Sequence, residues 1–394
     1  MKKYLYPAKI LLPKSEFEKW AVIACDQYTS DPEYWREVEE FVGDAPSTLN
    51  LVLPEIYLSD AEKRIKSINS NMKEYLETDK FNVVDNSMIY VERELASNGK
   101  RRGLVGVIDL ETYEYEKGKQ ALVRATEQTV AERIPPRVQI RKDAPLEFPH
   151  VLLFIDDPND TVLGGLQQKK EQMEKAYDFE LMKNSGHIEG YFVNSEEFDI
   201  INEQLEALIN QGLLFAVGDG NHSLATAKEC YRLNGSEKSR YALVEVVNIH
   251  ESAIEFEPIY RVLFNVDKQE LITSMKEYLT ECNSTEGHRF EVVSADGREE
   301  LYFKPISKLP VGTLQAFLDD YLKSHNEAEI DYIHGIDATV KLSSKDNTVG
   351  FIFDGMKKDE LFDAVIADGS LPRKTFSMGH ADDKRFYIEG RKIK

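Results

Sequence analysis

Short apolar runs alternate with amphipathic stretches along the chain, and this pattern predicts a fold of mixed strands and helices. Apolar runs of strand length occupy residues 21–25, 151–155 and 213–217, and such runs between turn residues are typical of buried strands. A helix is expected after Asp31, because Asp31 suits the cap position and Pro32 suits the first helical turn. The pattern therefore predicts an α+β protein with mixed sheets and packed helices.

Other segments extend this alternation. Residues 88–94 and 104–113 are expected to form a hairpin, because the Asn-Gly pair between them is a strong turn signal. A helix is expected to begin at Ser59, which has capping-box spacing to Glu62. The remaining expected helices span residues 124–134, 162–177, 195–210, 224–233, 268–280 and 313–324, and the remaining strands span residues 188–193 and 241–249. A proline pair after residue 134 is expected to end the first of these helices.

The length and charge of the chain limit its organisation and its partners. The 394 residues, of which 42% are hydrophobic, can bury a large core or two. We expect an N-terminal α+β region over residues 1–257 and a C-terminal α+β region over residues 258–394, whose end could return to the N-terminal site. The net charge of −21 at pH 7 disfavours nucleic acid as a partner, because its binding depends on basic side chains. A small anionic substrate would need a local basic pocket.

Cysteine content and hydropathy bear on location. Cys25, Cys230 and Cys282 are too few and too scattered for a disulfide framework or a cysteine-based zinc site. No segment has the length and hydropathy of a signal peptide or a membrane span. We therefore expect a cytoplasmic protein without a membrane partner, and the sequence predicts no oligomeric state.

One glycine-rich loop is the first candidate for chemistry. Its sequence is Gly218-Asp219-Gly220-Asn221-His222-Ser223. Two glycines let backbone N–H groups approach a ligand, and the helix that follows presents its positive end, so the loop can form an anion cradle. Asp219 could hold magnesium or accept a proton, and His222 titrates near neutral pH. The alternative is a tight strand-to-helix turn, since the loop matches neither a P-loop nor a dinucleotide-binding motif.

Basic residues gather in one segment of this acidic chain. They are Arg124, Arg133, Arg137, Arg141 and Lys142. Guanidinium groups suit phosphate or carboxylate recognition, but a solvated helix face whose arginines pair with Glu127 and Glu132 is the alternative. The seven histidines other than His222, His150 among them, show no ligand spacing with one another or with cysteine, so the sequence does not support a structural metal site. Cys25, which precedes Asp26, is expected to be a small buried residue rather than a nucleophile.

Several of these segments together resemble the bacterial and archaeal domain-of-unknown-function 1015 family. The matching segments are residues 24–28, 103–110, 124–137, 218–223 and 372–375, in the family's order and over nearly the whole chain. The resemblance implies a core of the ParB/sulfiredoxin-like superfamily, whose members bind nucleotides with an Asp-Gly-His-His-Arg loop, and some of them are free serine kinases.

Individual residues carry the resemblance to different extents. In the loop, Asp219, Gly220 and His222 match, whereas Asn221 replaces a histidine and Ser223 replaces the arginine that would bind phosphate. Elsewhere, the matching positions are Glu127 and Thr129 in a Glu-x-Thr element, Arg137 after it, and Lys374 and Thr375 in a Pro-x-Lys-Thr element. The resemblance implies that Arg137 and Lys374 could replace the missing arginine, and that Asp26, Glu127 or Asp219 is the base.

These observations lead to two hypotheses of different kinds. The first is a nucleotide-dependent phosphotransferase for a small hydroxyl metabolite, with free L-serine as acceptor and ATP or ADP with magnesium as donor. Its expected catalytic residues are Asp219, His222 and Glu127, and its expected phosphate- or nucleotide-binding residues are Gly218, Gly220, Asn221, Ser223, Arg124, Thr129, Arg137 and Lys374. The alternative is a ParB-like module that binds or senses nucleotide without turnover.

Overall fold

The described residues form two compact units. The computed structural model describes residues 2–97, 99–127 and 134–394. Unit 1 contains residues 2–97, 99–125, 134–254 and 380–394, and unit 2 contains residues 126–127 and 255–379. The chain thus leaves unit 1 near residue 254 and returns to it at residue 380. The last residues therefore belong to unit 1.

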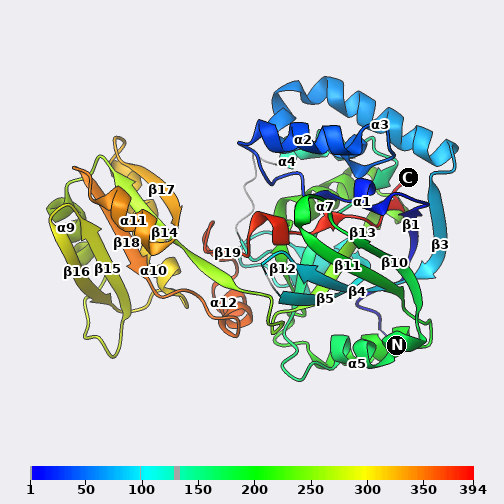
Figure 1. Ribbon diagram of the computed structural model, residues 1–394. Coiled ribbons are helices and arrows are strands. Elements are labelled where there is room, and N and C mark those ends of the chain that lie inside the picture. The colour runs from blue at the N-terminus through cyan, green and yellow to red at the C-terminus, as the bar shows by residue number, and fades with distance from the viewer. Residues whose placement is uncertain (1, 98, 128–133) are drawn as a thin grey trace. The chain divides into compact units, whose positions relative to one another are not determined.

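Unit 1 is built on a mixed sheet that has nine strands among the described residues (Figure 1). In spatial order these are β10 (Glu174–Glu180), β11 (Gly186–Phe192), β4 (Ile89–Leu95), β5 (Gly99–Asp109), β13 (Tyr241–Asn248), β9 (Leu152–Ile155), β12 (Phe215–Asp219), β7 (Val123–Arg124) and β6 (Tyr113–Glu114). The pairs β13–β9, β12–β7 and β7–β6 are parallel, and the other neighbours are antiparallel. This mixed sheet with packed helices confirms the predicted α+β fold class.

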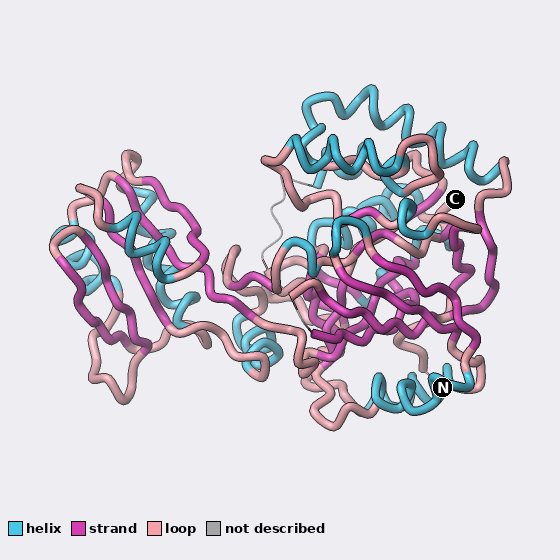
Figure 2. The backbone as a smooth tube through the Cα atoms, viewed as in Figure 1, coloured by secondary structure: helices cyan, strands magenta, loops and turns pink. Residues whose placement is uncertain are grey.

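Helices cover both faces of this sheet because its strands are apolar on both faces. The helices of unit 1 are α1 (Phe17–Trp20), α2 (Pro32–Val42), α3 (Ala61–Glu77), α4 (Ile134–Arg141), α5 (Val162–Lys169), α6 (Glu197–Ala207), α7 (Asn221–Asn234) and α8 (Glu237–Arg240). Along β5, Leu104 and Ile108 join the core that contains residues of α5 and α6, whereas Val105 and Val107 join the core that contains Trp35 of α2. Figures 1 and 2 accordingly show α5 and α2 on opposite sides of the sheet.

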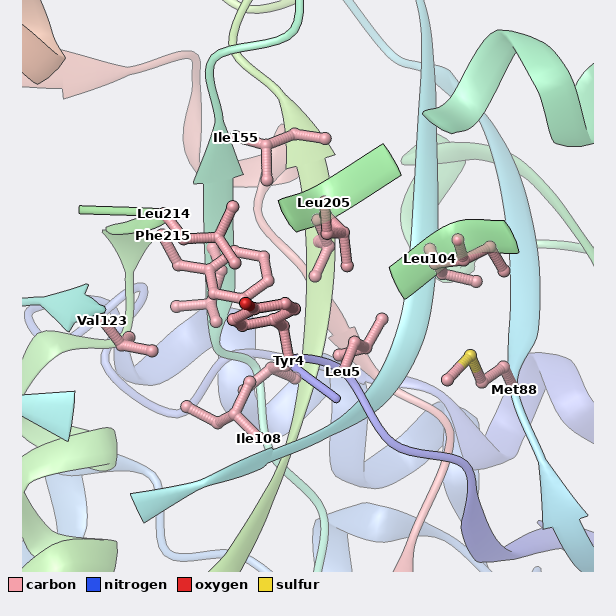
Figure 3. Close-up of a cluster of buried hydrophobic side chains, with 14 of the residues drawn as sticks. Tyr4, Leu5, Met88, Leu104, Ile108, Val123, Ile155, Leu205, Leu214 and Phe215 are labelled. Atoms are coloured by element: carbon pink, nitrogen blue, oxygen red, sulfur yellow. The ribbon is translucent and has the colours of Figure 1, made fainter. Parts of the chain in front are cut away.

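The N-terminal residues are part of the first of these cores. Tyr4 and Leu5 lie among Ile108, Leu205 and Phe215 (Figure 3). Their backbone N–H groups both donate to the buried Asn202 side chain, at 2.7 and 3.1 Å. This contact satisfies buried backbone donors that belong to no strand.

Two short strand pairs attach the C-terminal segment to unit 1. They are β2 (Val22–Ile23) with β20 (Phe386–Tyr387), and β8 (Leu146–Glu147) with β21 (Arg391–Lys392). A third pair, β1 (Ala8–Pro13) with β3 (Phe81–Ser87), lies nearer the N-terminus. Arg385 directly precedes β20 and is buried. Its guanidinium binds the carboxylates of Glu245 and Glu389, each at 2.6 Å. These contacts fix residues 385–392 on unit 1.

Unit 2 is a smaller antiparallel sheet with helices. Its strands are β16 (Gly297–Phe303), β15 (His288–Ser294), β18 (Thr348–Phe353), β14 (Phe256–Phe264) and β17 (Glu329–His334) in spatial order, with β19 (Phe376–Met378) paired to one end of β14. Its helices are α9 (Lys268–Tyr278), α10 (Pro310–Ser324), α11 (Ile336–Ser343) and α12 (Glu360–Asp368). No helix in the described parts of either unit is long and apolar enough to span a membrane.

Most expected elements are confirmed, with exceptions that have local causes. Asp31 caps α2 through a 3.0 Å hydrogen bond from the Tyr34 N–H group, as predicted. The capping box at Ser59 is wrong, because a 3₁₀ helix covers this position and α3 begins at Ala61 without a side-chain cap. The expected helix over residues 162–177 is also wrong in its second half.

In that second half, the residues form strand β10. Tyr177 and Phe179 are buried, whereas the alternate residues Asp178 and Glu180 are exposed, and this period of two is typical of a strand. The expected helix over residues 124–134 is contradicted at its start, because Arg124 belongs to β7, and residues 128–133 lie outside the described ranges. The expected end of a helix at the proline pair is wrong, because α4 continues through both prolines to Arg141.

We expect Gly218→Ala to destabilise unit 1. A Cβ at this position would lie 2.5 Å from Cε2 of the Phe154 ring, and overpacking of this kind costs about 1–3 kcal/mol of unfolding free energy. Urea denaturation measures the loss. Gly165→Ala in α5 is the control, because its Cβ would meet only the Gln204 side chain, at 3.7 Å. Equal stability of Gly218→Ala and the natural protein would contradict the packing seen at Phe154.

We expect Arg385→Met to lower the free energy of unfolding by more than Gly218→Ala does. The change leaves the buried Glu245 and Glu389 carboxylates without their cation, and breaking such a buried pair costs about 3–5 kcal/mol. Thermal and urea denaturation measure the difference. Lys66→Met is the control, because Lys66 pairs with Glu62 on the exposed surface of α3, where such a pair contributes no more than about 1 kcal/mol. A loss no larger than that of Lys66→Met would contradict the role of Arg385.

Candidate functional site

The predicted glycine-rich loop is the turn between β12 and α7. The structure explains why glycine occupies both Gly218 and Gly220. Gly220 caps α7 with φ of 81°, a value that favours glycine. Gly218 leaves room for the Phe154 ring. Asp219 ends β12, and its Oδ1 accepts a 2.9 Å hydrogen bond from the Gly220 N–H group. The loop is therefore a tight strand-to-helix turn that also fixes one carboxylate at the beginning of α7.

Strand pairing brings a histidine to this turn. Strand β9 runs antiparallel to β12, and Leu152 lies opposite Asp219 after an irregularity in the register. The residues just before β9 therefore lie beside the end of β12. One of them is His150, whose side chain is buried.

A second strand pair brings residues from both ends of the chain to the same place. Val22 of β2 lies opposite Tyr387 of β20, so the residues after β2 are close to those of the C-terminal segment. The Tyr387 hydroxyl accepts a 2.8 Å hydrogen bond from the Cys25 N–H group and lies 3.3 Å from Nδ1 of His150. Tyr387 thus links the backbone next to Asp26 to the His150 ring.

The result is a compact group of ionisable side chains, here termed the Asp-His-Asp cluster, made of Asp26, His150 and Asp219. One donor atom from each residue lies within 4.8 Å of the other two. The ammonium of Lys384 lies 3.6 Å from Oδ2 of Asp219. That oxygen is buried and accepts no hydrogen bond from the described residues. Two carboxylates, an imidazole and an ammonium therefore meet at the N-terminal end of α7.

The surroundings set the charge of Asp26. Burial by itself would raise the pKa of this carboxyl, but His150, a 3.3 Å hydrogen bond from Gln27 and the charge of Lys384 together lower it below its ordinary value. Asp26 is therefore ionised at neutral pH. The neighbouring Cys25 differs, because burial and the charge of Asp26 raise the pKa of its thiol to about 11. A protonated thiol is a poor nucleophile, and Cys25 is partly buried rather than fully buried as expected.

Two buried arginines hold the segment that carries Lys384. Arg93 and Arg101 donate to the carbonyl oxygen of Asp383, at 3.1 and 2.9 Å. Arg93 also donates to the carbonyl oxygens of Asp382 and Lys384. The Tyr28 hydroxyl also donates a hydrogen bond to the Asp382 carboxylate. The backbone on both sides of Lys384 is therefore held in place.

The basic and acidic residues predicted from the sequence are distributed over both units. Asn221, His222 and Ser223 form the first turn of α7 and are partly exposed beside Asp219. Arg124 is buried, and its guanidinium donates to the carbonyl oxygens of Ala121 and Gln211 and to the Gln120 side chain. These contacts give Arg124 a structural role, because they join the end of β7 to the residues before it and to the turn at Gln211.

Arg137 lies in α4 and pairs with Glu55. It is near the cluster, because Glu55 donates its N–H group to the Cys25 carbonyl oxygen at 2.8 Å. Glu127 belongs to unit 2, where its backbone forms an isolated parallel β-bridge with Leu371. Lys374 also belongs to unit 2, and its carbonyl oxygen accepts from Arg261 at 2.8 Å. Thr129 lies outside the described residues.

Sequence reasoning did not identify His150 or Lys384 as site residues. The structure places His150 beside two carboxylates, a position that the spacing of the histidines in the sequence did not predict. The signal that could identify both residues is the strand register, because His150 precedes β9 by two positions and Lys384 precedes β20 by two positions. Hydropathy patterns predict strands but not which strands are neighbours.

A second group of potential metal ligands lies on β10 and β11, and the side chains of His187 and Glu189 in it already form ion pairs with other residues. It consists of Asp178, His187 and Glu189. Both ring nitrogens of His187 lie 2.9 Å from carboxylates, those of Asp178 and Glu180, while Glu189 pairs with lysines. This group therefore serves as a comparison for the Asp-His-Asp cluster.

Comparisons with known proteins give one family and several distant structures. No curated protein matches the sequence. Similar solved structures include a conserved hypothetical protein from Pyrococcus furiosus (13% identity, 73% of this chain and 95% of that chain, TM-score 0.40). A free serine kinase in complex with AMP (12% identity, 73% and 92%, TM-score 0.42) and SbnI from Staphylococcus aureus (10% identity, 72% and 82%, TM-score 0.37) are also similar. The model of the family described as "Protein of unknown function (DUF1015)" matches residues 5–321, and the chain belongs to this family.

Proposed function

We propose that the protein is a nucleotide-dependent phosphotransferase that acts on a small hydroxyl metabolite. The observation that carries the proposal is the meeting of Asp26, Asp219 and Lys384 at the N-terminal end of α7. The family resemblance of the sequence motifs suggests free L-serine as the acceptor, ATP or ADP with magnesium as the donor, and a relation to the ParB/sulfiredoxin-like superfamily.

Two features at the N-terminal end of α7 would attract a phosphate group. The N-terminal end of a helix as long as α7 favours an anion, because its first N–H groups have no acceptor within the helix and the helix dipole is positive there. Lys384 adds an ammonium on the backbone that Arg93 and Arg101 hold. In a protein of net charge −21, the helix terminus and the Lys384 ammonium offer phosphate a local attraction, while the acidic surface repels it. In this proposal, Lys384 supplies the positive charge that the arginine of the family's loop would supply at position 223.

The carboxylates supply the other half of the reaction. Phosphoryl transfer forms a bond between the acceptor oxygen and the terminal phosphorus and breaks the bond from that phosphorus to the leaving oxygen of the nucleotide. The hydroxyl proton passes to a carboxylate, and Asp26 suits this role because it is ionised and partly exposed. Asp219 would be a carboxylate ligand for magnesium bound to the nucleotide, and the ion would supply neutralisation of phosphate charge.

We expect the purified protein to form phosphoserine from L-serine with ATP or ADP and magnesium. Asp219→Asn should lower kcat/KM by about 100-fold or more, because the amide keeps the contact to the Gly220 N–H group and removes only the charge. Mass spectrometry over a panel of amino acids identifies the product. Asp178→Asn, on β10, is the matched control and should retain full activity.

The outcomes separate the two hypotheses. Absence of a phosphorylated product with every donor and acceptor would overturn the phosphotransferase. Calorimetry with ATP, ADP and CTP then decides whether the chain is a nucleotide-binding module without turnover, which the serine at position 223 favours. Full activity of Asp219→Asn would move the site away from the β12–α7 turn.

A further inference from the structure

The Asp-His-Asp cluster contains a donor set that the nucleotide reaction does not require. Magnesium takes oxygen ligands and keeps several waters, so two carboxylates would be enough for a magnesium nucleotide. The third member is His150, which is 6% exposed and precedes β9 by two residues. A buried imidazole between two carboxylates is a donor set for first-row divalent metals.

The orientation of His150 is fixed in the way that metal-bound histidines are fixed. Its Nδ1 lies 3.3 Å from the Tyr387 hydroxyl, which leaves Nε2 as the nitrogen for a ligand. The same hydroxyl accepts the Cys25 N–H group at 2.8 Å. A contact of the second ring nitrogen that orients the imidazole is a general feature of metal sites. Tyr387 therefore positions both the His150 ring and the backbone that carries Asp26.

A second observation that favours a metal ion is the incomplete hydrogen bonding of the Asp219 carboxylate. Its Oδ2 is buried and accepts no hydrogen bond from the described residues, which is costly for a carboxylate oxygen. The nearest cation is the Lys384 ammonium at 3.6 Å, beyond hydrogen-bond distance. A metal ion about 2.1 Å from each donor would bring the three donors to about 3 Å from one another. Because they already lie within 4.8 Å, small side-chain rotations suffice.

We propose that Asp26, His150 and Asp219 bind one first-row divalent metal ion of the manganese, iron or zinc class, without nucleotide, and that Lys384 is the counter-charge that this ion displaces. Three protein ligands leave further coordination positions open to water or to a phosphate oxygen. Lys384 can withdraw because its ammonium is carried on a flexible stem. The binding does not depend on turnover and holds whether the protein is a kinase or a binding module.

Manganese alone, added to the full-length protein without nucleotide, tests the proposal. Electron paramagnetic resonance of free Mn²⁺ should show one ion bound per chain, and Mg²⁺ should displace it only at about a tenfold or larger excess. Asp219→Asn and His150→Gln should each weaken binding at least about tenfold. Lys384→Met should strengthen it about threefold or more, because it removes a competing cation.

Asp178→Asn is the matched control and should bind Mn²⁺ as the natural protein does, because both ring nitrogens of His187 are occupied. Circular dichroism confirms that each variant is folded, and Lys384→Met tests the site through a gain of affinity that misfolding cannot produce. Absence of bound Mn²⁺ in the natural protein, or unchanged affinity in folded His150→Gln, would overturn the proposal. Phosphoserine formation plays no part in these measurements, so failure of the kinase and failure of the metal site are distinguishable.

Discussion

The pairing of Arg385 with Glu245 and Glu389 is the contact on which the candidate site depends. All three side chains are buried, so each carboxylate needs the guanidinium and the guanidinium needs both of them. Glu245 lies in the middle of β13, a strand between β5 and β9. The contact therefore anchors a segment from the end of the chain directly to the central sheet. Lys384 on one side of Arg385 and Tyr387 on the other both face the site as a consequence.

This arrangement explains how an acidic chain can hold positive charge at a chosen point. Arg93 and Arg101 lie on adjacent strands and are buried, and their pKa values are lowered, first of all by burial. They donate mainly to backbone carbonyl oxygens of residues 382–384, whose satisfaction offsets part of the cost of burial. The two guanidinium groups thus order the backbone, while the ammonium of Lys384 remains for the cluster.

The sequence predicted most elements and the turn of the candidate site, and the two residues of the candidate site that it did not identify share one cause. Strands β9 and β12, helix α7 and the turn at Asp219 follow from local patterns, because apolar runs and glycine positions act within a few residues. His150 and Lys384 depend on the β9–β12 and β2–β20 registers, and the second register joins residues more than 360 positions apart. Lys374 carries the motif resemblance, but the cation beside Asp219 in unit 1 is Lys384.

The same lysine connects the two proposals for this site. While Lys384 faces Asp219, the cluster carries two carboxylates and one ammonium, and it is only partly compensated. A divalent ion would balance both carboxylates and release the ammonium, which then lies next to the N-terminal end of α7, where phosphate is favoured. Metal binding at the Asp-His-Asp cluster would therefore raise the affinity for phosphate. By linkage, phosphate would raise the affinity for the metal by the same factor, so one flexible side chain is sufficient to couple the two ligands.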